Sequence, residues 1–181
     1  AEPYVRIEMK MAQERLEAAP GDVDAQATLA LAHRRAGNLA FGRNQFDLAA
    51  EAHMRARAMQ MKFRDTAPEN AAAAALSLMH AGRAHVGARR GAEARHALNT
   101  AIIEMQALVA THPNARFQDS LIEAFELLGD ALLLPKSHAA KAHKAYRNAL
   151  EIIDVAAAKR TLAASEVRRR TLIADKLRKI Q

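Results

Sequence analysis

Residues 82–101 read GRAHVGARRGAEARHALNTA, and this stretch decides the fold. Its glycine, Gly82, is followed by a polar break around Arg89–Gly91 and then by Ala94, Leu98 and Ala101. The last three residues are spaced i, i+4 and i+7, so they lie on one face of a single helix. The stretch therefore predicts two helices joined by a short turn, with a glycine where the helices cross.

The same pattern occurs once before this stretch and once after it. Each copy has a glycine followed by three residues at helical spacing, and the turn of the last copy is one residue longer. In chain order the copies are Gly37 with Ala49, His53 and Ala56; Gly82 with Ala94, Leu98 and Ala101; and Gly129 with Ala142, Tyr146 and Ala149. Three copies of one helix–turn–helix unit indicate a repeat array.

This pattern resembles the tetratricopeptide (TPR) repeat. The family's glycine after a small or aliphatic residue matches Ala36-Gly37, Ala81-Gly82 and Leu128-Gly129, and its aromatic residue in the second helix matches Tyr146. The glycines are 45 and 47 residues apart, which is longer than the standard period of about 34. In this respect the chain is similar to long-period arrays attached to bacterial signalling proteins, serine/threonine kinases among them. The resemblance implies antiparallel helix pairs stacked as a right-handed α-solenoid.

The composition favours an all-α protein. Alanine, the best helix former, accounts for 44 of the 181 residues, and few β-branched runs leave almost no strand signal. The absence of cysteine excludes disulfides and thiolate metal sites, and no apolar run approaches the ~20 residues that span a bilayer. The first residue is Ala1 and not Met, so either an N-terminal segment was removed or the chain is a piece of a longer protein. We favour the second, because helical repeats are common in larger chains, and the resemblance implies a cytoplasmic or periplasmic segment of a larger bacterial protein.

The periodicity predicts about eight helices in a single array over residues 1–181. We expect a half repeat at 1–20, repeats at 21–68, 69–113 and 114–158, and a terminal basic helix at 159–181. The third helix should extend from about Phe46 to Phe63, and the last from about Thr161 to Ile180. Asp22 or Asp24 is expected to cap the second helix, and Ser137, after the break at Pro135, the seventh.

The resemblance also implies a binding surface, because the first helices of stacked units line a concave groove. Its positions lie six and three residues before each glycine and one and four residues after it. They are Leu31, Arg34, Asn38 and Phe41; Leu76, Met79, Arg83 and Val86; and Glu123, Glu126, Asp130 and Leu133. We therefore expect a protein partner that binds as an extended peptide or a helix, acidic at one end and basic at the other. Arg57, on a second helix, is expected on the outer face.

The net charge of +7 suggests a second hypothesis from a different class. Residues 136–181 hold 12 basic and 4 acidic side chains, whereas residues 1–135 hold 15 and 16. The terminal helix could therefore bind nucleic acid or an anionic membrane, although it lacks the interleaved aromatics of many nucleic-acid readers. The candidate residues are Arg168, Arg169, Arg170, Lys176, Arg178 and Lys179.

The sequence predicts no catalytic residue, metal or cofactor. The pairs His80/His85 and His138/His143 are five residues apart, which places the two rings on different sides of a helix, whereas metal pairs use i, i+3 or i, i+4. His53 is expected to fill the aromatic position of its repeat. The carboxylates at 123, 126 and 130 lack a neighbouring nucleophile motif. We therefore expect a non-enzymatic interaction scaffold or sensory segment, and an enzymatic or small-ligand site is the third hypothesis.

Overall fold

The computed structural model describes residues 2–134 and 138–180, and in this part of the chain every regular element is helical. The helices are α1 (Glu2–Ala18), α2 (Val23–Gly42), α3 (Phe46–Gln60), α4 (Pro68–Gly87), α5 (Gly91–Thr111), α6 (Ala115–Leu132), α7 (Ala139–Ala157) and α8 (Ala164–Arg178), with a 3₁₀ helix η1 (Arg64–Thr66). The predicted all-α class with eight helices is confirmed. Pro135 and the predicted cap Ser137 lie outside the described residues.

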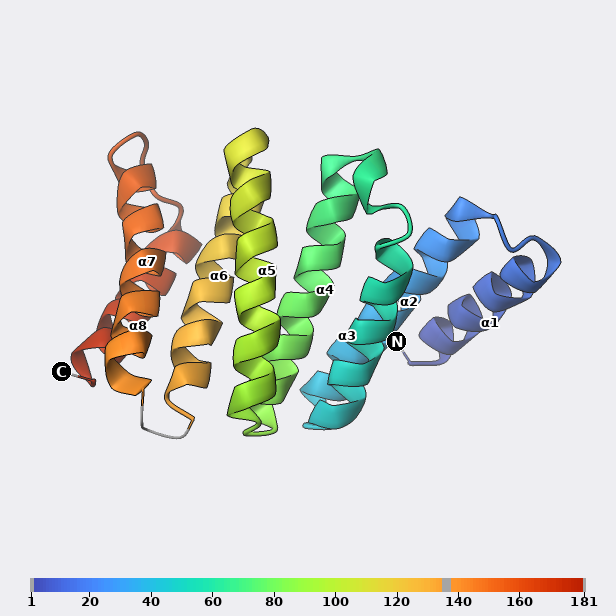
Figure 1. Cartoon of the computed structure of the whole chain (residues 1–181), viewed down its shortest axis with the longest axis horizontal. Helices are drawn as coiled ribbons and strands as arrows, with labels where there is room; N and C mark the ends of the chain where they lie inside the picture. The colour runs from blue at the N-terminus through green and yellow to red at the C-terminus, as the bar shows by residue number, and fades with distance from the viewer. Residues whose placement is uncertain (1, 135–137, 181) are drawn as a thin grey trace.

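Each helix packs against the next one along the chain, and α4 also contacts α6. Figure 1 shows the helices side by side in chain order, with α2, α6 and α8 passing behind their neighbours α3, α5 and α7. None of the described helices is both long and apolar enough to cross a membrane.

The glycines that define the repeats lie where the two helices of each pair approach closely. A Cβ atom added to Gly37 would lie 2.7 Å from His53 Nε2, and one added to Gly82 would lie 2.7 Å from Leu98 Cγ. At Gly129 it would lie 2.6 Å from Tyr146 Cζ. The three helix pairs therefore repeat one contact, between the glycine and the residue that the pattern places between two alanines. His53 fills the aromatic position as expected, with 2% of its surface exposed.

The turns of the first two pairs also share a backbone conformation. Asn44 and Arg89 both have φ of 59°, the left-handed region that few side chains adopt. Each lies seven residues after its glycine, Gly37 or Gly82. Capping follows the sequence as well, because the Asp22 carboxylate accepts a hydrogen bond from the Ala25 amide at 2.9 Å.

Several helix ends differ from the predictions. The third helix stops at Gln60, and Phe63 reaches the core from the segment before η1 and not from the helix itself. Pro68 occupies the first turn of α4, where its missing amide hydrogen costs nothing. The last helix covers Ala164–Arg178 and is shorter at both ends than expected.

Arg57 is not an outer-face residue. Its guanidinium forms two hydrogen bonds with the Glu104 carboxylate of α5, at 2.9 and 2.6 Å, and a third with the Ala74 carbonyl of α4 at 3.0 Å. The side chains of Arg57 and Glu104 are 13% and 19% exposed. Arg57 therefore ties α3 to both helices of the following pair.

Candidate functional site

The predicted groove residues lie on α2, α4 and α6, and their surroundings differ from one helix to the next. Leu31, Asn38 and Arg83 are exposed, while Arg34 and Phe41 are half-buried. Leu76, Val86 and Leu133 are half-buried against the main core. Met79 is fully buried in that core, so its assignment to a binding surface is wrong. The physical reason is that α4 packs against α3, α5 and α6 at once, which leaves less of its surface open.

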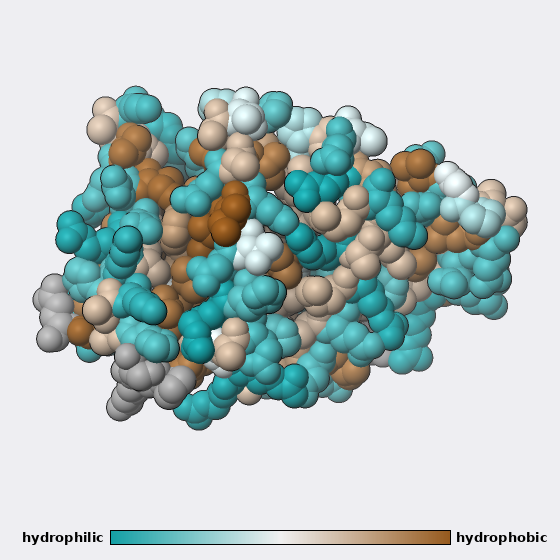
Figure 2. Space-filling model, viewed as in Figure 1, coloured by the Kyte–Doolittle hydropathy of each residue, from teal (hydrophilic) through white to brown (hydrophobic). Residues whose placement is uncertain are grey.

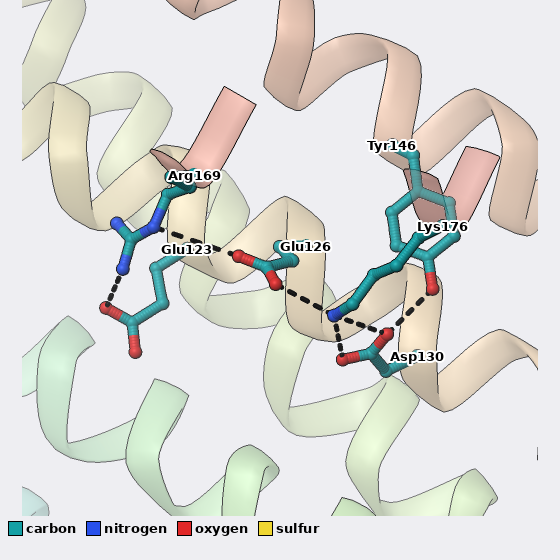
Figure 3. A network of polar contacts seen from close by, with 6 residues as sticks. All are labelled: Glu123, Glu126, Asp130, Tyr146, Arg169 and Lys176. Atoms are coloured by element: carbon teal, nitrogen blue, oxygen red, sulfur yellow. Dashed lines mark hydrogen bonds and ion pairs between the residues drawn. The ribbon is translucent and has the colours of Figure 1, made fainter. Parts of the chain in front are cut away.

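The acidic face, which we define as Glu123, Glu126 and Asp130 of α6, is covered by the chain's own α8. Lys176 Nζ lies 2.8 Å from Glu126 Oε1 and 2.9 Å from both Asp130 oxygens. Arg169 contacts Glu123 and Glu126 at 3.7 and 3.8 Å. Figure 3 shows the two cations reaching across to the three carboxylates. The structure thus brings together two sets of residues that the sequence suggested as separate sites.

Both ion pairs and apolar packing attach α8, with Ile173 in the main core and Leu177 packed against it. Ile173 is the one buried side chain of this helix, which the structure describes in full. The Tyr146 hydroxyl donates a hydrogen bond to Asp130 at 2.7 Å, so Asp130 links α7 and α8 (Figure 3). Burial alone lowers the pKa of Lys176, but its bonds to Asp130 and Glu126 outweigh burial and raise that pKa. The two cations of α8 therefore partly neutralise the three carboxylates of the acidic face, where the sequence predicts the basic end of a partner.

The basic residues of α8 are likewise largely paired. Arg170 binds Asp154 at 2.7 Å, and Arg178 binds Asp175 on the same helix. With Arg169 and Lys176 engaged on α6, four of the six cations proposed for polyanion binding have acidic partners. Arg168 and Lys179 are exposed and have none among residues 2–134 and 138–180.

The opposite end of the predicted groove is basic and remains open. We define the basic face as Arg34 and Phe41 of α2 with His80 and Arg83 of α4. The Arg83 guanidinium carbon lies 4.4 Å from the centre of the Phe41 ring, a cation–π contact, and the Phe41 ring meets Phe46 edge-on at 5.4 Å. Within the described part of the chain, neither Arg34 nor Arg83 has an acidic partner.

Two imidazole rings in tilted contact lie beside these arginines. The rings of His53 and His80 have centroids 5.2 Å apart. Burial, the neighbouring His80 and the charges of Arg34 and Arg83 lower the pKa of His53 to about 3. Burial and the same two arginines lower the pKa of His80 to about 4. Both rings are therefore neutral at pH 7, and Nδ1 of His53 is buried without a hydrogen-bond partner among the described residues.

This pair makes the protein sensitive to acid. Because the folded pKa values lie below the ordinary value near 6.5, unfolding takes up protons below pH 6.5. The contribution of the two histidines to stability is therefore fully present above that pH and is lost as the pH falls toward 3 to 4.

His53→Leu tests this pH dependence, because leucine is the residue found at the equivalent position 98 opposite Gly82. Between pH 7 and pH 5 we expect the free energy of unfolding of His53→Leu to fall by about 2 kcal/mol less than that of the unchanged protein. Urea unfolding at both pH values measures the difference, and His96→Gln, which removes an exposed histidine, is the control. The same change of stability with pH in both variants would contradict the role given to His53.

A hollow lies away from the basic face, on the side of α5, α6 and α7. Figure 2 shows hydrophobic atoms gathered in the furrow between α5 and α7, where Phe125, Leu128 and Leu132 of α6 line a hollow of about 430 Å³. Its rim carries Lys141 and Lys144 of α7. No group of three metal-binding side chains occurs within residues 2–134 and 138–180.

Comparison with known proteins adds no identity. No protein-family model matches the chain, and a search of curated proteins finds no match to it. The resemblance to TPR repeats therefore rests on the residues of the chain itself.

Proposed function

We propose that this chain is a non-enzymatic protein-interaction module, in which the basic face binds an acidic segment of a partner protein. The observation that carries the proposal is the contrast between the two ends of the predicted groove. The carboxylates of the acidic face already have cations from α8, whereas Arg34 and Arg83 of the basic face have no acidic partner among the described residues. A partner that supplies acidic side chains would pair with Arg34 and Arg83, as the cations of α8 pair with the carboxylates of the acidic face.

The proposed architecture is a right-handed TPR-like α-solenoid within a larger bacterial signalling protein. The packing of consecutive helices and the contact between α4 and α6 support the stacking of units, and the repeated glycine contacts support their equivalence. In such an array, the first helices of the units present a continuous surface to an extended or helical ligand. The basic face is the part of that surface that α8 leaves open.

Charge and apolar surface have different roles in the proposed complex. Arg34 and Arg83 attract and orient an acidic segment, which mainly raises the association rate. Phe41 and the exposed Leu31 offer apolar contacts, which carry more of the affinity when they are buried. The sequence suggested a ligand that is acidic at one end and basic at the other. The proposed partner needs only the acidic segment.

The test uses a helix-forming peptide of leucine and glutamate as the probe. We expect the double variant Arg34→Gln/Arg83→Gln to bind it about tenfold or more weakly, because two charge-assisted contacts are lost. The control, Arg35→Gln/Arg55→Gln, removes two paired arginines from α2 and α3 and should bind normally. Isothermal titration calorimetry measures both.

Two results would contradict the proposal. One is equal weakening in both double variants, which would mean that only net charge matters. The other is failure of the peptide to bind while DNA or anionic vesicles bind, with loss of that binding in Arg168→Gln/Lys179→Gln. The interaction would then belong to α8.

A further inference from the structure

We propose that Arg34 and Arg83 bind one carboxylate or phosphate group between them, next to the paired rings of His53 and His80. The inference deepens the proposed function and rests on it: it names the chemical group of the partner that the basic face recognises. It also makes this face a site where a charge-changing modification of the partner, such as phosphorylation, would alter binding.

The first argument is geometric. Arg34 lies three residues before Gly37, the residue of α2 that packs against the His53 ring. Arg83 lies three residues after His80 on α4, and the rings of His80 and His53 have centroids 5.2 Å apart. Because residues three apart are neighbours on a helix surface, both arginines lie next to the same ring pair. The cation–π contact with Phe41 holds Arg83 at that position. A guanidinium presents a planar set of donors that matches the oxygens of a carboxylate or phosphate.

The second argument is the state of the buried groups. Arg34 is half-buried, and burial lowers its pKa, so its charge is partly desolvated, and no acidic side chain of residues 2–134 and 138–180 pairs with it. His53 is nearly fully buried, and its Nδ1 has no hydrogen-bond partner in the described chain. Buried polar atoms normally have partners, and a buried charge is normally paired. A bound anion would neutralise the charges of Arg34 and Arg83, which now act on His53 and His80.

The third argument is a coupling between anion and proton. The charged groups that act on His80 are Arg34 of α2 and Arg83 of α4, and they act on His53 of α3 as well. A bound anion opposes both arginines and therefore raises the pKa of His80. By linkage, protonation of His80 must then strengthen anion binding. If the bound anion raises that pKa to about 6, affinity rises roughly fourfold as the pH falls from about 7.5 to about 5.5.

The experiment titrates the full chain with sodium phosphate, glutarate or chloride at equal ionic strength and follows the histidine ring signals by NMR. We expect phosphate, glutarate or both to shift the signals of His80 and to raise its pKa, while chloride does not. For glutarate, whose carboxylates remain largely ionised above about pH 5, binding should tighten as the pH falls. A stronger response to phosphate would identify a phosphoryl group as the preferred ligand, and an equal response a carboxylate.

The matched variants are Arg34→Gln, Arg83→Gln and the control Arg35→Gln, each of which removes one positive charge. In Arg34→Gln and Arg83→Gln, the anion-dependent shift of the His80 signals should be at least several-fold smaller than in the unchanged protein. In Arg35→Gln it should be unchanged. The site is overturned if neither phosphate nor glutarate shifts the signals beyond chloride, or if all three variants respond alike. That failure is distinct from failure of the proposed function: the leucine–glutamate peptide would still bind the α2 and α4 surface if only the anion site were wrong.

Discussion

Gly129→Ala should destabilise the protein by about 2–3 kcal/mol, because the added methyl group overpacks the contact between α6 and α7. The new Cβ would lie 2.6 Å from Tyr146 Cζ and against two further ring atoms. The ring cannot move away easily, because Tyr146 is buried and its hydroxyl is bonded to Asp130. This overpacking outweighs the gain of up to about 1 kcal/mol that alanine brings to a helix over glycine.

Gly42→Ala is the matched control for this substitution. Gly42 is the last residue of α2, and an added Cβ there meets no atom within 4 Å. We expect its stability in urea unfolding to be unchanged or raised by up to about 1 kcal/mol. Equal stabilities for Gly129→Ala and Gly42→Ala would show that the glycine contact does not define the packing of the repeat.

Arg57→Met should cost about 2–4 kcal/mol, because it leaves the mostly buried Glu104 carboxylate without its partner. It also removes the bond from Arg57 to the Ala74 carbonyl. Arg55→Met is the control, since Arg55 and Glu51 form an exposed pair one turn apart on α3, and such pairs contribute at most about 0.5 kcal/mol. Chemical unfolding of the two variants gives the comparison.

A second substitution separates the ion pair from simple loss of packing. In Arg57→Met/Glu104→Met both charges are absent, so we expect most of the stability to return. If Arg57→Met is no worse than Arg55→Met, the pair does not join α3 to α5 energetically. If the double variant loses as much free energy of unfolding as Arg57→Met and Glu104→Met lose together, packing and not charge explains the loss.

The repeat contacts were predictable because they are set by local spacing. The offset from each glycine to His53, Leu98 or Tyr146 follows from helix geometry and a short turn, and these are properties of consecutive residues. The shorter third helix was not predictable in the same way: Phe63 continues the apolar period, but the chain leaves the helix at Gln60 and still delivers this ring to the core.

The contents of the candidate site were only partly predictable, because they depend on partners far apart in the chain. Glu126 and Lys176 are 50 residues apart, and each looked like a free charge. One signal was present: Arg169 and Lys176 are seven residues apart on their helix, as Glu123 and Asp130 are on theirs, so two turns of one helix match two turns of the other. Burial of Met79 and the contact of the His80 ring with His53 depend on how three helices meet, and no spacing rule encodes that.

The central claim, that the face shared by α2 and α4 is the binding surface, is tested most directly by NMR. Amide and methyl signals of the full chain are followed during titration with the leucine–glutamate peptide. We predict that the shifted signals cluster on residues 31–41 and 76–86, with Arg34, Phe41 and Arg83 among them, and that α8 signals stay in place. Shifts confined to α3, α5 and α7, or to α8, would contradict the account.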